Sequence, residues 1–159
     1  MITQDVINES TQKAEDFLRQ ILTQAGREAE FESNWDEEAG SLKVVITGDN
    51  LSDFIGEDGK VIDSLQYLTT LVVNKKRDDF VRILLDIDGY REKRKQELIK
   101  LAIEKAELVK AEGSPVSLPA MSPYERRVIH MTLQDDDCIE TESQGKDPYR
   151  YLVIKPAEE

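Results

Sequence analysis

The fold is decided by the stretch Ile55-Gly56-Glu57-Asp58-Gly59-Lys60, in which two glycines bracket two residues between two predicted helices. The first helix is short, over residues 50–55, with an N-cap candidate, and the second runs from Lys60 to Asn74 with an apolar stripe. Glycine lacks a Cβ atom, and the amides at the start of a helix favour an anion, so phosphate can approach such a turn closely. The stretch therefore predicts either a phosphate-binding turn or a plain helix-turn-helix in which Asp58 caps the second helix.

The first part of the chain predicts one α+β unit around this turn. Its elements in chain order are a helix over residues 3–25 ended by Gly26, strands over Glu30–Glu32 and Ser41–Thr47, the two helices above, and a strand over Phe80–Ile87. The first two strands form a hairpin around an acidic turn that contains Asn34 and Gly40. The order is helix, strand, strand, helix, helix, strand.

A second α+β unit is predicted after residue 89. It begins with a long helix, Tyr90–Glu112, which places an apolar face opposite many charges and ends at Gly113-Ser114-Pro115. The residues expected on the apolar face are Ile99, Ala102, Ala106 and Val109. The remaining predicted elements are an extended piece over Val116–Leu118, a helix over Pro123–Leu133, and strands over Ile139–Glu142 and Tyr149–Ile154.

A second motif lies in the predicted helix over Pro123–Leu133, where Arg126 and His130 stand four residues apart and share a helix face. Arginine can grip a phosphate with two hydrogen bonds, and histidine can donate another or stack beneath a base. The pair therefore predicts a small anion site, with Arg127 beside it. The alternative is that His130 is a structural residue with its hydrogen bonds satisfied inside the protein.

The net negative charge of the chain opposes binding of a nucleic acid at these sites. The chain of 159 residues has a net charge of −12, whereas nucleic-acid affinity usually comes from Lys and Arg. The charge is unevenly distributed, because residues 90–112 hold 7 basic and 5 acidic residues and residues 27–89 hold 7 basic and 15 acidic ones. Any binding must therefore depend on local groups.

Composition points to a soluble cytoplasmic protein. Charged residues make up 34% of the chain, and no apolar stretch approaches the roughly 20 residues of a membrane-spanning helix. The start, Met1–Asp5, has no basic leader followed by an apolar core, so we expect no secretory signal. The single cysteine, Cys138, cannot form an internal disulfide.

The element order around Gly-x-x-Gly resembles the type II, bacterial form of the KH domain, over residues 1–89. In that family the loop clamps the backbone of about four unpaired nucleotides while an apolar groove holds the bases. The resemblance implies that Gly56, Gly59 and Lys60 contact RNA. The two middle residues, Glu57 and Asp58, are acidic where binding-competent members are polar or basic, so they repel a phosphodiester.

The sequence over Leu118–His130, with the predicted closing strands, resembles the R-three-H domain, named for Arg-x-x-x-His, and we assign residues 90–157 to it. A KH domain joined to this one is similar to the Jag family of bacterial RNA-binding proteins associated with the membrane insertase. The resemblance implies that Arg126, Arg127 and His130 contact RNA. Many Jag proteins carry a further small N-terminal domain, for which we expect no counterpart in this sequence.

Two basic clusters each have two interpretations, and one acidic run has a single one. The basic residues at the start of the long helix, Arg91, Lys93, Arg94 and Lys95, extend a track for the RNA backbone or form a solvated helix face. The run Lys75-Lys76-Arg77 is equally ambiguous. The run Asp135-Asp136-Asp137 lacks the spacing of a metal loop and predicts a solvated turn.

These observations predict a non-enzymatic, single-stranded RNA-binding protein without a cofactor, acting as a post-transcriptional regulator or RNA chaperone. No Walker-type loop, His-Glu-x-x-His motif or nucleophile beside His130 indicates catalysis. The alternative is a protein-interaction adaptor, whose acidic KH surface binds another small KH protein or the cytoplasmic tail of a membrane insertase. A metal-dependent nucleic-acid hydrolase is a distant third.

Overall fold

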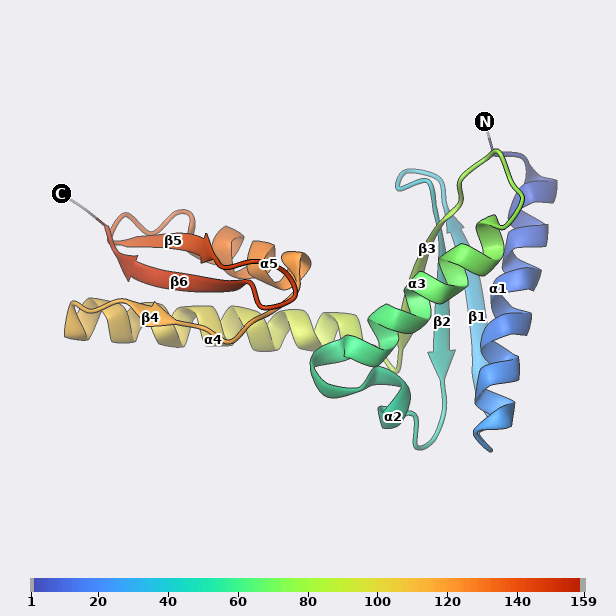
Figure 1. Ribbon diagram of the computed structural model, residues 1–159, viewed down its shortest axis with the longest axis horizontal. Helices are drawn as coiled ribbons and strands as arrows, with labels where there is room; N and C mark the ends of the chain where they lie inside the picture. Colours follow the sequence, from blue (N-terminus) through green and yellow to red (C-terminus); the bar gives the residue numbers. More distant parts are fainter. Residues whose placement is uncertain (1, 158–159) are drawn as a thin grey trace. The chain divides into compact units, whose positions relative to one another are not determined.

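The computed structural model describes residues 2–157 and divides the chain into two compact units, one ending at Arg91 and the other beginning at Glu92. Figure 1 shows that each unit combines helices with a small sheet, which confirms the α+β class. The first unit contains α1 (Gln4–Gln24), β1 (Glu30–Asp36), β2 (Ser41–Thr47), α2 (Ser52–Ile55), the 3-10 helix η1 (Glu57–Gly59), α3 (Lys60–Asn74) and β3 (Arg82–Ile87). The order predicted for a type II KH domain is therefore present.

The first sheet has the strand order β1-β2-β3, with β1 antiparallel and β3 parallel to the central strand β2. Its core face follows from the register, in which Val44 of β2 pairs with Leu85 of β3 and both are buried. Helices α1 and α3 pack against each other and against this face (Figure 1). The opposite face is polar, because every second residue of β1, beginning at Glu30, is exposed.

The second unit is built around a sheet of order β4-β6-β5, in which all pairs are antiparallel. Its elements are α4 (Tyr90–Glu112), most of which lies in this unit, β4 (Val116–Ser117), α5 (Pro123–Leu133), β5 (Ile139–Gln144) and β6 (Tyr151–Pro156). Its core contains Ala102 of α4, Ile129 of α5 and Ile154 of β6, each fully buried. One apolar cluster therefore holds both helices and the sheet of this unit together.

Helix α5 begins where local hydrogen bonding dictates. The Ser122 hydroxyl accepts from the Glu125 amide at 3.2 Å, and the Glu125 carboxylate accepts from the Ser122 amide at 3.0 Å. Pro123 occupies the first helical position, where no hydrogen bond is lost with its missing N–H. The other Glu125 oxygen accepts a bond of 2.8 Å from Arg94 Nε, so the same buried carboxylate ties α5 to α4.

The helix boundaries predicted from sequence hold within one residue for α1 and without change for α3, α4 and α5. Several strand and turn predictions were wrong in their limits. β1 extends to Asp36, so Asn34 lies in the strand, where it pairs with Lys43, and not in the turn. β3 begins only at Arg82. These differences arise because strand length is set by pairing with a neighbour, which sequence alone does not show.

Three smaller predictions also need correction. The buried residue at the start of the α4 core face is Leu98 and not Ile99, which is half-buried. Helix α2 begins at Ser52 with Leu51 at its N-cap and no side-chain cap, so its predicted capping is absent. Strand β6 runs over Tyr151–Pro156, two residues later than predicted at both ends.

None of the helices in residues 2–157 is both long enough and apolar enough to cross a membrane.

Candidate nucleic-acid interface

The Gly-x-x-Gly turn reverses the chain through three left-handed residues. Gly56, Asp58 and Gly59 have φ angles of 73°, 52° and 76°. The Gly56 amide donates to the Ser52 carbonyl at 3.0 Å, and the Gly59 amide donates to the Gly56 carbonyl at 3.3 Å. Gly59 is the N-cap of α3 and has no side chain with which to cap it. The turn thus delivers the chain directly into the N-terminus of a 15-residue helix.

Packing inside the unit requires both glycines. A Cβ atom on Gly56 would collide with the side chain of Val61. A Cβ atom on Gly59 would lie 2.7 Å from Cε1 of Tyr90 and 2.8 Å from its hydroxyl oxygen. Besides the access for phosphate inferred from the sequence, the fold itself therefore needs residues without a side chain at these two positions.

The side chains of the turn lie at the surface. Glu57 and Asp58 are exposed, and Lys60 pairs with Glu57 across 3.4 Å. An ion pair between such exposed groups contributes little to stability. The turn therefore presents two carboxylates and one partly neutralised ammonium group at the start of α3.

Arg91 holds the chain next to this turn. Its Nη1 atom lies 2.5 Å from Oδ1 of Asp63 on α3, its Nε donates to the Leu85 carbonyl at 3.2 Å, and its amide donates to Asp86 at 3.1 Å. Leu85 also donates its amide to Gln66 of α3 at 2.9 Å. Arg91 thus joins α3 to β3 and has an internal role, although it lies in the basic cluster of α4.

The other ambiguous clusters also contain structural residues. Arg94 binds Glu125, and Arg77 binds Glu9 at 3.0 Å with its own side chain nearly buried. The contacts from Lys13 and Arg77 hold the pKa of Glu9 below its usual value. The exposed positions Lys93 and Lys95 remain compatible with either interpretation of the α4 cluster.

In the second unit the structure turns the motif arginine inward. Arg126 is 7% exposed, and its Nη1 donates to the Met121 carbonyl at 2.6 Å, to Oδ1 of Asp147 at 3.3 Å and to the Arg150 carbonyl at 3.4 Å. A buried guanidinium is stable only when its donors are satisfied in this way. Arg126 therefore joins the start of α5 to the connection between β5 and β6.

The two other predicted residues of this motif lie outward. Arg127 is exposed, and His130 is exposed with its Nδ1 atom 2.6 Å from the Thr141 hydroxyl on β5. That contact orients the imidazole ring, whichever atom donates the proton. Arg126 and His130 lie on the same face of α5, as predicted, but the Arg126 side chain is buried and the His130 side chain is exposed. Their joint contact with one phosphate stays a prediction.

The aspartate run 135–137 forms a turn in which one carboxylate has a partner. Lys110 Nζ lies 2.6 Å from Oδ2 of Asp136. This pair raises the pKa of Lys110 and lowers that of Asp136. Within residues 2–157, no group of three or more His, Cys, Asp or Glu side chains is arranged to hold a metal ion.

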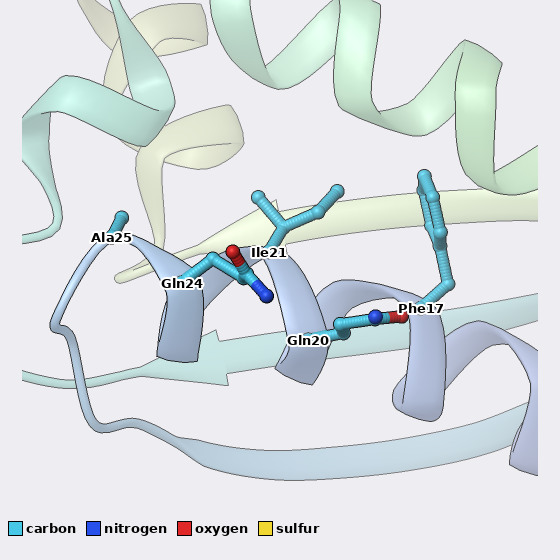
Figure 2. A pocket seen from close by; sticks show the side chains of 5 residues that line it. All are labelled: Phe17, Gln20, Ile21, Gln24 and Ala25. Carbon is cyan, nitrogen blue, oxygen red and sulfur yellow. The ribbon is translucent and has the colours of Figure 1, made fainter.

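An open hollow lies on α1, and none of the predicted binding residues lines it. Figure 2 shows that it is lined by Phe17, Gln20, Ile21, Gln24 and Ala25. These side chains are apolar or neutral, so they offer no charge that would hold a phosphate. The hollow is therefore no part of the candidate interface.

Comparison with known proteins gives two family matches. Residues 11–87 match the KH domain of KhpA/KhpB, and residues 96–156 match the R-three-H domain. A protein of Clostridium symbiosum, "RNA-binding protein KhpB", is 41% identical over 142 residues, which cover 89% of this chain and 64% of that protein. Proteins of the same name from Bacillus subtilis and Lactiplantibacillus plantarum are 33% and 32% identical over 74% and 87% of this chain.

The chain joins a KH domain of the KhpA/KhpB type to an R-three-H domain, as in the Jag-family relatives named KhpB. It spans 64%, 42% and 58% of the lengths of the relatives from C. symbiosum, L. plantarum and B. subtilis. The KH and R-three-H assignments made from sequence are confirmed, and both candidate motifs lie within the matched regions.

Three residues that shape these Jag-family motifs were missed in the sequence. Val61 and Tyr90 occupy the space that side chains at positions 56 and 59 would fill, and Asp147 supplies the carboxylate that faces Arg126. In the sequence, Tyr90 is recognisable only as an aromatic residue after a strand, and Asp147 only as an acidic residue in a turn. Neither signal specifies a contact, because Tyr90 and Asp147 are distant in the chain from Gly59 and Arg126, and Val61, although near Gly56 in sequence, reads only as one member of an apolar stripe.

We expect Gly56→Ala to destabilise the first unit more than Gly40→Ala. Both glycines have positive φ, which costs a residue with a Cβ atom about 1–2 kcal/mol, but only Gly56 faces a collision, with Val61. Urea unfolding followed by fluorescence of Trp35, the sole tryptophan and part of β1, reports on this unit. Equal losses in the two variants would show that Val61 moves aside without destabilising the unit.

We expect Arg126→Ala to loosen the connection over residues 145–150, whereas Arg127→Ala leaves it unchanged. The first substitution removes a buried charged donor, which contributes about 1.5–3 kcal/mol, and the second removes an exposed side chain. Hydrogen exchange followed by mass spectrometry measures protection of this segment. Unchanged protection in Arg126→Ala would contradict the structural role of the guanidinium.

Proposed function

We propose that this chain binds single-stranded RNA in the bacterial cytoplasm without catalysing a reaction on it. The observation that carries the proposal is the turn at Gly56–Gly59, where three residues with positive φ lead the chain into the N-terminus of α3, beside the exposed Lys60. Oriented amides and the positive end of a helix dipole favour a phosphate at such a place. The proposed modules are a KH domain within residues 1–89 and an R-three-H domain within residues 90–157.

The family relationship supports this proposal. The relatives are named RNA-binding proteins, and KH domains clamp unpaired nucleotides through their Gly-x-x-Gly loop. In this chain Gly56, Gly59 and Lys60 would lie along the RNA backbone. Glu57 and Asp58 would lower the affinity, since their exposed carboxylates face the same phosphates.

The R-three-H module would contribute through its outward side chains. Arg127 supplies an exposed guanidinium for a phosphate, and His130 supplies a ring whose orientation Thr141 holds. Arg126 enters this proposal mainly through the loop that it holds, because its guanidinium is buried and already bonded. A protein of this kind acts on transcripts as a post-transcriptional regulator or RNA chaperone.

A protein-binding role is the second candidate, and the surface of α3 favours it. This helix exposes several large apolar side chains, which is unusual for a polar surface. They are Val61, Tyr67, Leu68 and Leu71. The first unit also has 10 basic and 19 acidic residues, so a basic partner is electrostatically favoured. Such a partner would be another small KH protein or the cytoplasmic tail of a membrane insertase.

Measuring whether each module binds RNA distinguishes the RNA-binding function from the protein-binding function. An adaptor predicts no shift of short single-stranded RNA at either low or physiological salt, whereas the RNA-binding proposal predicts a shift that weakens as salt rises. Incubation of labelled RNA with Mg²⁺ or Mn²⁺ tests for hydrolysis in the same samples.

We expect Glu57→Lys with Asp58→Lys to strengthen RNA binding, most clearly at low salt. The change removes two repelling carboxylates and adds two cations beside the proposed phosphate path. The matched control is Glu37→Lys with Glu38→Lys, which makes the same charge change in the exposed β1–β2 turn, at the other end of β2. Fluorescence anisotropy with a short RNA measures both. An equal gain in the two variants would mean that RNA does not reach the Gly-x-x-Gly turn.

We expect Arg127→Ala to weaken RNA binding about tenfold and His130→Ala to weaken it less. A charge-assisted contact to phosphate contributes about 1.5–3 kcal/mol, whereas a neutral hydrogen bond contributes about 1 kcal/mol. Lys100→Ala is the control, since it removes one exposed positive charge from the same unit. Affinity that falls equally in Arg127→Ala and Lys100→Ala would indicate general electrostatics and no defined site.

A further inference from the structure

The connection between β5 and β6, residues 145–150, is tied to its surroundings at several points. The Tyr149 amide donates to the Lys146 carbonyl at 2.8 Å, which closes a turn. The Arg150 carbonyl accepts from the Met121 amide at 3.1 Å and from Arg126 Nη1 at 3.4 Å. Bonds from a neighbouring segment and from a buried side chain hold the loop in one conformation, although its ordering is opposed by conformational entropy.

This restrained loop displays an aromatic ring. Tyr149 is 78% exposed, the largest exposed fraction among the large apolar and aromatic side chains in the described part of the chain. Its backbone is fixed by the turn and by its neighbour Arg150, while its side chain contributes nothing to the apolar core of the unit. A ring that lies outside the apolar core, on a backbone held by hydrogen bonds, is available to contact a ligand.

One exposed cation, Lys146, lies near Tyr149 and can meet a phosphate. Lys146 is exposed in the same loop, and the carboxylate of Asp147 is opposed by Arg126. The second unit has 11 basic and 14 acidic residues, so it repels phosphate less than the first unit, with 10 basic and 19 acidic residues.

Strand β5 connects the loop of Tyr149 to Thr141, the residue that contacts His130. Strand β5 leads from Thr141, which contacts His130, to Gln144, a distance of about 10 Å at the rise of an extended chain. Gln144 in turn accepts a hydrogen bond from the Tyr151 hydroxyl at 3.2 Å, which secures the base of the loop. Thr141 and Gln144 are three residues apart, so their side chains lie on opposite faces of the sheet, and the strand sets only the spacing between the loop and the contact with His130.

We propose that Tyr149 is a stacking platform for an unpaired RNA base, with Lys146 contacting an adjacent phosphate and Arg126 positioning the loop that carries both. This proposal rests on the proposed RNA-binding function and adds a subsite to it. Aromatic rings bind bases of any identity through their faces, so the site recognises an unpaired base as such and selects no sequence.

The test compares Tyr149→Ala, Tyr149→Phe and the wild-type chain, with a short RNA and an abasic oligonucleotide of the same length. Stacking predicts that Tyr149→Ala loses at least about fivefold in RNA affinity, the lower end of one base–aromatic contact, and that Tyr149→Phe stays near the wild type. Affinity for the abasic oligonucleotide should be the same in all three proteins. Phe80→Ala is the matched control, since Phe80 is 68% exposed and lies outside both motifs.

Wild-type RNA affinity in Tyr149→Ala would overturn this proposal while leaving RNA binding intact. Failure of the wild-type chain to bind any RNA would instead overturn the proposed function and this subsite with it. A loss of affinity for the abasic oligonucleotide equal to that for RNA would show that the ring only supports the loop.

A second measurement reports on direct contact. Trp35→Phe combined with Tyr149→Trp leaves one tryptophan, at position 149. RNA should quench the fluorescence of this tryptophan, because stacking places a base against the indole. In the control variant, Trp35→Phe with Phe80→Trp, RNA should leave the tryptophan fluorescence unchanged. Equal quenching at the two positions, or none at position 149, would contradict the stacking contact.

Discussion

The left-handed backbone at Gly56 and Gly59 is the constraint on which the first unit depends. It ends α2, reverses the chain and starts α3 so that Ile62, Leu65 and Val73 reach the buried face of the sheet. The volume that side chains would need at the two glycines belongs to Val61 and Tyr90. The start of α3 and the packing of Val61 and Tyr90 therefore depend on the same two glycines, and one cannot be changed without the other.

A comparable constraint acts in the second unit through a buried cation. Burial of the Arg126 guanidinium would be unfavourable without the two carbonyls and the carboxylate that surround it. Those acceptors lie in two segments, before α5 and between β5 and β6, so the arginine fixes segments that are far apart in sequence. The residue that names the R-three-H motif serves here to arrange the surface, and its neighbours Arg127 and His130 form that surface.

Net charge describes this molecule poorly because many charges are neutralised locally. Several arginines have internal partners: Arg91 joins α3 to β3, and Arg94 holds the buried Glu125 that caps α5. These groups are unavailable to phosphate, whereas the exposed Lys60 and Arg127 are placed beside the two motifs. Counting basic residues would therefore overestimate the number that can contact RNA and would miss where they lie.

Sequence alone determined the helices, their order and both motifs, since apolar periodicity, capping by Ser122 and glycine turns are encoded within a few neighbouring residues. Strand limits could not be read in this way, because β1 extends to Asp36 only through pairing with β2. The tertiary structure alone decided that Arg126 points inward, that Tyr90 packs on Gly59 and that the loop of Tyr149 is held in place. Each of these outcomes depends on a contact between residues distant in the chain, and local sequence carries no information about which distant atoms will fill a given space.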